Sequence, residues 1–130
     1  RGFTHDDFYG AQLYGRIGYH TFEGITLFDD EKTRMIASLG DKHILVLRNH
    51  GIAVGESSIE KTFFLLWTVQ RAAENQCVAG ALGGEDNPLG EGVAEKCAGL
   101  TAMLIRDSGF ADTFFAAMVR KLRAERTLPW

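Results

Sequence analysis

The segment 43–47 (His-Ile-Leu-Val-Leu), apolar after its first residue, constrains the fold of this chain more than any other feature. Consecutive apolar residues that include a β-branched one are typical of a central strand buried on both faces. Such a strand requires neighbouring strands on both edges. The chain offers only about three extended segments, so we predict an α/β fold whose remaining strands come from a preceding segment or a partner chain.

Two further segments are predicted to be extended. Residues 52–54 (Ile-Ala-Val) resume the strand pattern after Asn49-His50-Gly51, so we expect a bend or bulge at Gly51. Residues 8–20 are rich in aromatic residues and glycine, and each glycine inside a helix costs about 1 kcal/mol relative to alanine. This segment is therefore predicted to be an extended or irregular strand.

Capping residues predict where the first two helices begin. Asp29-Asp30 is expected to cap a short helix that stops at Gly40. Ser57 and Glu60 have the spacing of a capping box, which starts a long helix over about residues 58–81.

Two more helices are predicted after the loop at residues 83–88. Asn87 is the expected N-cap and Pro88 the first helical residue, because proline is well tolerated at that position. This third helix should stop near Gly109, and a last helix follows from Phe110.

The spacing of apolar residues predicts the buried face of each later helix. In the long helix this face comprises Ile59, Phe63, Leu66, Gln70, Ala73 and Cys77, and Phe64, Trp67 and Val78 widen its apolar surface, so we expect it to pack on more than one neighbour. In the two helices after it, the faces comprise Leu89, Val93, Cys97, Leu100 and Leu104, and then Phe110, Phe114, Met118 and Leu122.

Composition narrows the classes of function. The chain has 130 residues, and 14 Lys and Arg against 17 Asp and Glu give a formal net charge of −3, which argues against a nucleic-acid partner. Cys77 and Cys97 lie in helical patterns and are expected to be buried thiols in a reducing compartment. There is no signal-peptide pattern and no apolar run long enough to span a membrane, so we expect a cytoplasmic protein without a membrane partner.

His50 is the candidate ligand-binding residue of the sequence. It follows the predicted central strand, at the edge where α/β sheets usually bind ligands, and a neutral imidazole is a good zinc ligand. A structural histidine bonded to a backbone carbonyl is the alternative, and His50 by itself favours it because zinc normally needs three protein ligands. His5, His20 and His43 form no motif with it.

The chain resembles the C-terminal half of the class II aldolase/adducin family. The resemblance rests on Arg48-Asn49-His50-Gly51 with the capped helix behind it, and on residues 19–25, which match a Y-x-x-[YF]-x-G segment of that family. Residues 83–87 also resemble the segment that follows the long helix in adducin-like members. The match covers about residues 6–88, and the signature is specific only as a whole.

The resemblance implies a three-layer α/β/α sandwich, of which residues 1–130 form the C-terminal portion of a single domain, and a homotetramer. Members bind zinc or another divalent ion through three histidines, of which His50 is the one present here, while the other two and the catalytic Glu belong to the preceding portion. Phe22 matches an aromatic residue at the active-site edge, with an ordinary core or interface aromatic as the alternative.

The implied function is that of a metal-dependent lyase of the class II aldolase type, acting on a small sugar phosphate or a related carbonyl compound. The alternative is a non-catalytic, adducin-like binding or assembly module with a cytoskeletal partner such as actin. No catalytic acid or base can be assigned within the chain. Glu23 and Glu56 lie near the relevant segments and are expected to be solvated loop carboxylates.

Overall fold

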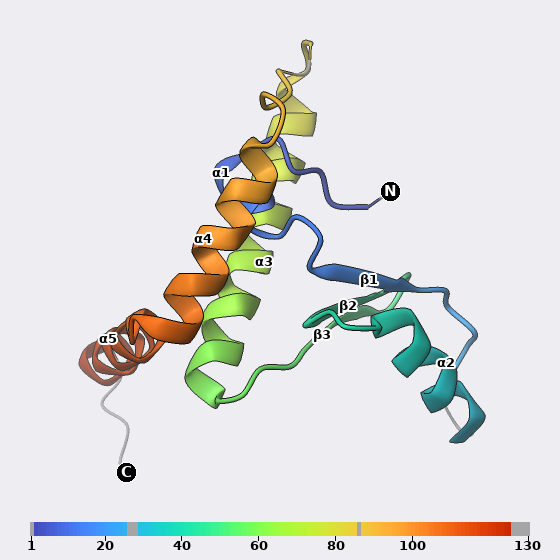
Figure 1. Cartoon of the computed structure of the whole chain (residues 1–130), viewed down its shortest axis with the longest axis horizontal. Helices are drawn as coiled ribbons and strands as arrows, with labels where there is room; N and C mark the ends of the chain where they lie inside the picture. The colour runs from blue at the N-terminus through green and yellow to red at the C-terminus, as the bar shows by residue number, and fades with distance from the viewer. Residues whose placement is uncertain (1, 26–28, 86, 126–130) are drawn as a thin grey trace.

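The computed structural model describes residues 2–25, 29–85 and 87–125 and confirms a mixed α/β fold (Figure 1). A small sheet lies beside a long helix. The last helix packs against this long helix, and the helix before it packs mainly on the short first helix. The elements in chain order are α1 (Phe8–Gln12), β1 (Ile17–His20), α2 (Asp29–Leu39), β2 (Ile44–Leu47), β3 (Gly51–Val54), α3 (Ile59–Leu82), α4 (Val93–Asp107) and α5 (Phe110–Glu125). None of the described helices is long and apolar enough to cross a membrane.

The sheet has the strand order β1-β2-β3, so the apolar segment is its central strand, as predicted. β1 runs parallel to β2, with His20 opposite Leu47 in the register, and β3 runs antiparallel to β2. The predicted bend is a complete reversal of the chain, not a bulge. The His50 N–H donates to the Leu47 carbonyl over 3.0 Å, and Asn49 adopts φ +60°, a conformation that asparagine tolerates better than most residues.

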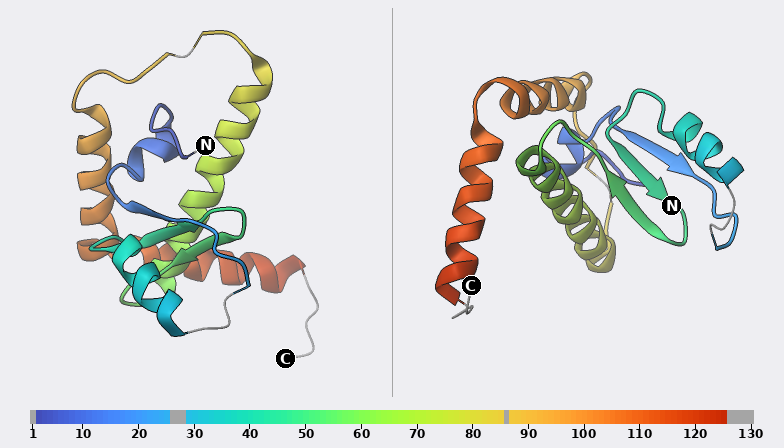
Figure 2. Two further views of the ribbon diagram at one scale, coloured as in Figure 1. Left: turned by 90° about the vertical axis from the view of Figure 1, so that its right-hand side faces the viewer. Right: turned by 90° about the horizontal axis from the view of Figure 1, so that it is seen from below.

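Helices cover both faces of the sheet, which gives the α/β/α layering expected for this part of the fold (Figure 2). Alternate residues of a strand point to opposite faces. In β1, Ile17 joins the cluster that includes Leu65 of α3, whereas Gly18 lies against Ser38 of α2. A Cβ atom on Gly18 would overlap the Ser38 carbonyl oxygen, so the close packing of α2 on β1 requires glycine here.

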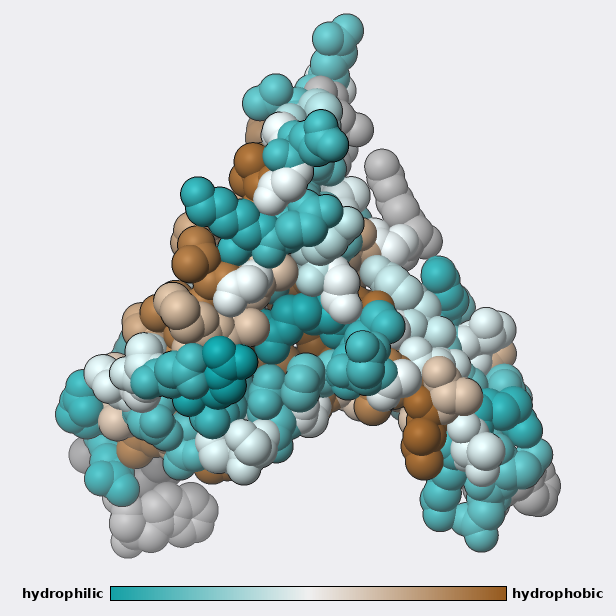
Figure 3. All heavy atoms as spheres, in the orientation of Figure 1, coloured by the Kyte–Doolittle hydropathy of each residue, from teal (hydrophilic) through white to brown (hydrophobic). Residues whose placement is uncertain are grey.

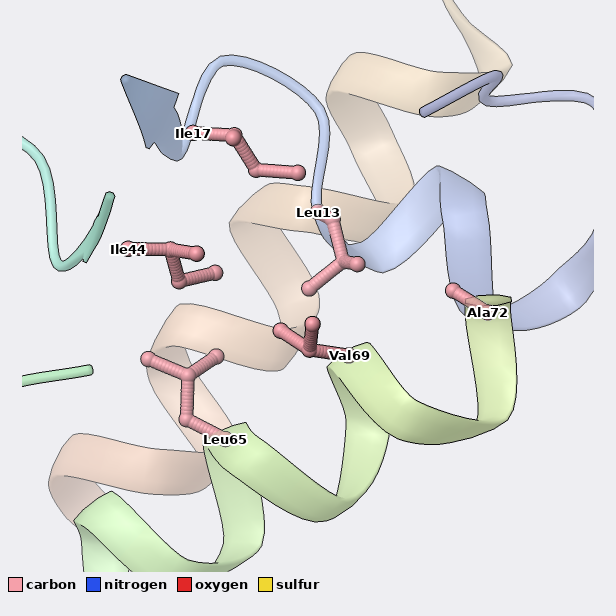
Figure 4. Close-up of a cluster of buried hydrophobic side chains, with 6 residues drawn as sticks. All are labelled: Leu13, Ile17, Ile44, Leu65, Val69 and Ala72. Atoms are coloured by element: carbon pink, nitrogen blue, oxygen red, sulfur yellow. The ribbon is translucent and has the colours of Figure 1, made fainter. Parts of the chain in front are cut away.

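The main core lies between the sheet and α3 (Figure 4). Leu13, Ile44, Leu65 and Val69 are fully buried there. Removing side chains of this size from water stabilises a fold by about 1.5–3 kcal/mol each. This cluster therefore fixes the sheet, and the turns at its edge, against the longest helix.

A second cluster attaches the last two helices to α3. Phe64 is buried together with Ile105 of α4 and Ala111 of α5, and the Phe114 ring packs edge-on against the Phe64 ring at 5.4 Å between centroids. Phe63, predicted to be buried, is only half-buried and packs its ring on α5.

Four local predictions are wrong. Of residues 8–20, predicted to be extended or irregular, residues 17–20 do form β1, but residues 8–12 form a helix. The Asp7 carboxylate accepts hydrogen bonds from two backbone N–H groups of the first turn, which outweighs the glycine penalty. Ser58, not Ser57, caps α3 by accepting from the Lys61 N–H.

The other two errors concern helix starts. α4 begins at Val93 after Gly92, which has φ +72°, so Asn87 and Pro88 precede the helix instead of starting it. Asp29 and Asp30 lie inside the first turn of α2, where their negative charge suits the helix dipole, and do not cap it.

The predicted buried faces of α3 and α4 are rotated from the observed ones. α3 buries Phe64, Leu65, Thr68, Val69 and Ala72, whereas Ile59, Leu66 and Cys77 of the predicted face are exposed. α4 buries Ala98, Thr101 and Ile105, whereas its Leu100, Met103 and Leu104 are exposed. Apolar side chains therefore gather on the surface along α4, at the left of the view (Figure 3). Cys77 is exposed and Cys97 is half-buried, so the prediction that both thiols are buried is wrong.

Candidate functional site

A pocket lies at the carboxyl ends of the two parallel strands. The Arg48 N–H donates to the His20 carbonyl over 3.0 Å, which holds the turn after β2 beside the segment after β1. The first half of α2 closes the third side. The pocket is lined by His20, Thr21, Phe22, Gly24, Glu31, Met35, Leu47, Arg48 and His50.

His50 lies in this pocket, on the turn between β2 and β3, and is exposed to solvent. Its backbone is fixed by the hydrogen bond to Leu47 and by its place between two paired strands. The structure thus places His50 at the edge formed by the carboxyl ends of β1 and β2, the kind of edge at which α/β sheets usually bind ligands. Its role as a metal ligand stays a prediction.

Phe22 lines the same pocket and is 51% exposed. A phenyl ring so open to solvent contributes little to the core. The position of Phe22 therefore favours the edge of a site over a core aromatic, while its functional role stays a prediction.

His20, Glu23 and Glu31 bring three possible metal-ligand atoms within 4.8 Å of one another. His20 Nε2 lies 3.8 Å from one carboxylate oxygen of Glu23 and 3.8 Å from one of Glu31. His20 belongs to no sequence motif, so this group was not predicted from the sequence. Its only sequence signal is a histidine at the end of a strand followed by acidic residues at the start of the next helix.

His20 is buried, with 5% of its surface exposed. Its Nδ1 atom lies 3.0 Å from Ser38 Oγ. Its Nε2 atom is buried and has no hydrogen-bond partner among the described residues. Buried polar atoms are nearly always paired, so this nitrogen indicates a missing partner.

Glu23 lies at the more open side of the group and is bonded to Arg34. The Arg34 Nε atom donates to the Glu23 oxygens over 3.1 and 3.0 Å, and its Nη1 atom donates to Asp30 over 2.9 Å. These hydrogen bonds from Arg34 hold the pKa of both carboxyl groups below the ordinary range. Glu23 is therefore an ion-paired carboxylate and not simply a solvated one.

The other residues considered from the sequence lie outside the pocket. Glu56 was expected to be solvated, but its side chain is 11% exposed and pairs with Arg16 over 3.4 Å. Burial lowers the pKa of Arg16, and the charge of Glu56 opposes that change. His43 lies 3.5 Å from the same Glu56 oxygen at the opposite end of β2, and the His5 ring contacts the Gly10 carbonyl.

The donor set of the pocket suits a divalent metal ion. It includes the imidazoles of His20 and His50 and the carboxylate of Glu31, which are ligand types used by zinc and related ions. The unpartnered His20 nitrogen supports this fit. Within the described residues, the three-residue group does not include His50.

Comparison with known proteins identifies the family to which the chain is similar. Residues 3–77, more than half of the chain, match the Class II Aldolase and Adducin N-terminal domain family. A Pseudomonas aeruginosa protein named "Putative aldolase class 2 protein" is 42% identical over 69 residues, which cover 53% of this chain and 27% of that protein. "Adducin-related protein 1" of Caenorhabditis elegans is 40% identical over 77 residues, covering 59% and 10%.

A solved structure gives the same relationship in three dimensions. An aldolase II superfamily protein from Pseudomonas syringae superimposes with a TM-score of 0.87 at 29% identity. The match covers 95% of this chain and 49% of that one, so the chain spans about half of the solved relative and less than a third of the curated ones. The match over residues 3–77 shows that the chain belongs to the class II aldolase and adducin family.

Proposed function

We propose that the protein containing this chain is a metal-dependent lyase of the class II aldolase type that cleaves a small sugar phosphate or related carbonyl compound. Residues 1–130 would form the C-terminal portion of one domain. The observation that carries the proposal is the position of His50 in the pocket at the carboxyl ends of β1 and β2. Membership of the aldolase family agrees with it.

His50 would hold the ion together with histidines from the remaining portion of the protein or from a neighbouring subunit of a tetramer. A bound divalent ion would supply Lewis-acid stabilisation of the negative charge that develops on the substrate oxygen as a carbon–carbon bond breaks. Phe22 would cover the pocket and limit the access of water.

Arg48 supports an anionic substrate. It lines the pocket, and its guanidinium carbon lies 5.0 Å from the centre of the Tyr19 ring, on the face of β1 opposite His20. A guanidinium is a good partner for a phosphate group. Arg48 would bind the phosphate by turning from Tyr19 toward the pocket, and would hold the carbonyl end of the substrate toward His50.

The experiment that tests the proposal measures metal content and aldol cleavage in the protein carrying His50→Ala. We expect the loss of one metal ion per chain and of lyase activity against a panel of sugar phosphates, with the fold unchanged. His43→Ala, which removes an imidazole at the other end of β2, serves as the matched control. Unchanged metal content in His50→Ala would return this residue to a structural role.

The similarity to an adducin-related protein favours a second candidate, a non-catalytic binding or assembly module. This candidate predicts no aldol cleavage in the unaltered protein with any substrate of the panel. Binding to actin filaments in a co-sedimentation assay, unaffected by His50→Ala, would support it.

A further inference from the structure

We propose that His20, Glu23 and Glu31 form a second divalent-cation site, built entirely from this chain and independent of the role of His50. The site lies between the end of β1 and the first turns of α2, on the α2 side of the pocket. It does not rest on the lyase proposal, because none of its three ligands is His50.

The ligand atoms are separated by distances close to those found around a single metal ion. His20 Nε2 lies 3.8 Å from an oxygen of Glu23 and 3.8 Å from an oxygen of Glu31, which is too long for hydrogen bonds. Two ligands on a tetrahedral ion with bonds of about 2.1 Å lie about 3.4 Å apart. The two carboxylate oxygens lie within 4.8 Å of each other. Shifts of no more than about 1 Å at each carboxylate would therefore bring all three atoms onto one ion.

The orientation of the His20 ring also suits metal binding. If Nδ1 carries the proton and donates it to Ser38 Oγ over 3.0 Å, Nε2 presents its lone pair toward the two carboxylates. Metal-binding histidines are usually held in this way by a hydrogen bond from the second ring nitrogen. Without an ion, Nε2 is a buried atom with no partner among the described residues.

The carboxylates of the group also suit a divalent cation. Glu23 and Glu31 supply two carboxylates for a divalent ion, and both Glu23 oxygens also accept hydrogen bonds from Arg34, whose positive charge offsets part of their negative charge. Glu31 is 8% exposed, so its carboxylate would be costly to bury without a cationic partner. One nitrogen and two oxygens with an open position toward the pocket suit Zn²⁺, with Mn²⁺ binding more weakly.

The test is titration of the chelator-treated 130-residue chain with Co²⁺, which reports coordination through its visible absorption, followed by displacement with Zn²⁺. We expect one ion per chain. Glu23→Gln and Glu31→Gln should each weaken binding by more than the change caused by Ser38→Ala, which should weaken it about 10- to 100-fold because only the ring orientation is lost. Glu23 lies in an exposed segment, so its substitution leaves the core intact.

Matched controls separate this site from other sources of binding. Glu91→Gln alters an exposed carboxylate elsewhere, His43→Asn removes an imidazole outside the pocket, and neither should change Co²⁺ affinity. His50→Ala should also leave it unchanged, even if the lyase proposal is right. Absence of saturable binding, or binding that survives Glu23→Gln and Glu31→Gln, would overturn the proposal. Loss of binding in His50→Ala alone would overturn it as well, by assigning the ion to His50.

Discussion

The side chains of His20 and Ser38 meet over 3.0 Å and join the last residue of β1 to the end of α2. Gly18, two residues earlier on the same face of the strand, makes this approach possible because its missing Cβ leaves room for the Ser38 carbonyl. The geometry of the candidate metal site therefore depends on a backbone contact in the core.

Gly18→Ala should destabilise the chain by about 1–3 kcal/mol, because the added methyl group overlaps backbone atoms that cannot rotate away. The free energy of unfolding from urea titration measures this effect. Gly99→Ala is the matched control, since Gly99 lies inside α4 with open space around it and should gain about 0.5–1 kcal/mol in helix propensity. Equal stability of the two variants would contradict the observed packing of α2 on β1.

Leu65→Ala should destabilise the chain by about 2–5 kcal/mol, because Leu65 is fully buried between the sheet and α3 and its loss leaves a cavity. Its neighbour Leu66 is 45% exposed, so Leu66→Ala should cost far less. Thermal or urea unfolding of this adjacent pair tests the rotation of α3 directly. A larger effect at Leu66 would restore the face predicted from the sequence.

The contrast between buried Leu65 and exposed Leu66 shows why the sequence predicts α3 but not its buried face. Apolar residues occur around much of this helix, so two different stripes satisfy a helical period. The choice between them depends on what packs against the helix, which is a property of α1, the sheet and α5. In α4 the small Ala98 and Thr101 are buried while larger residues are exposed, a pattern that residue size alone would not suggest.

The strands were more predictable because their signal is local. The run at residues 43–47 marked the central strand, and Asn49-His50-Gly51 marked its end. His50 was found as a candidate for the same reason. His20 and Glu31 are eleven residues apart and meet only because α2 folds back along β1, so no local spacing indicates their contact.

Tyr14→Phe should raise the pKa of Glu95 toward its ordinary value of 4.5, because the Tyr14 hydroxyl lowers that pKa by hydrogen bonding. A carboxyl group with a lowered pKa in the folded state contributes stability above its unfolded pKa and loses it as the pH falls through the folded pKa. The contribution is thus present at neutral pH and disappears below about pH 4.5. NMR titration of the Glu95 carboxyl carbon in both proteins measures the change, and identical titration curves would exclude the contact.

Arg48→Gln should raise KM for a phosphorylated substrate about tenfold or more in the protein with lyase activity, because a charge-assisted bond to phosphate is lost. The kcat value should change less, since Arg48 would bind the substrate away from the reacting carbon. An unphosphorylated analogue should show no change in KM, and it provides the control within the same variant. Lys42→Gln, at the opposite end of β2, tests whether general positive charge is responsible. Equal changes in KM for both substrates would mean that Arg48 shapes the pocket through its contact with Tyr19 and does not bind the phosphate.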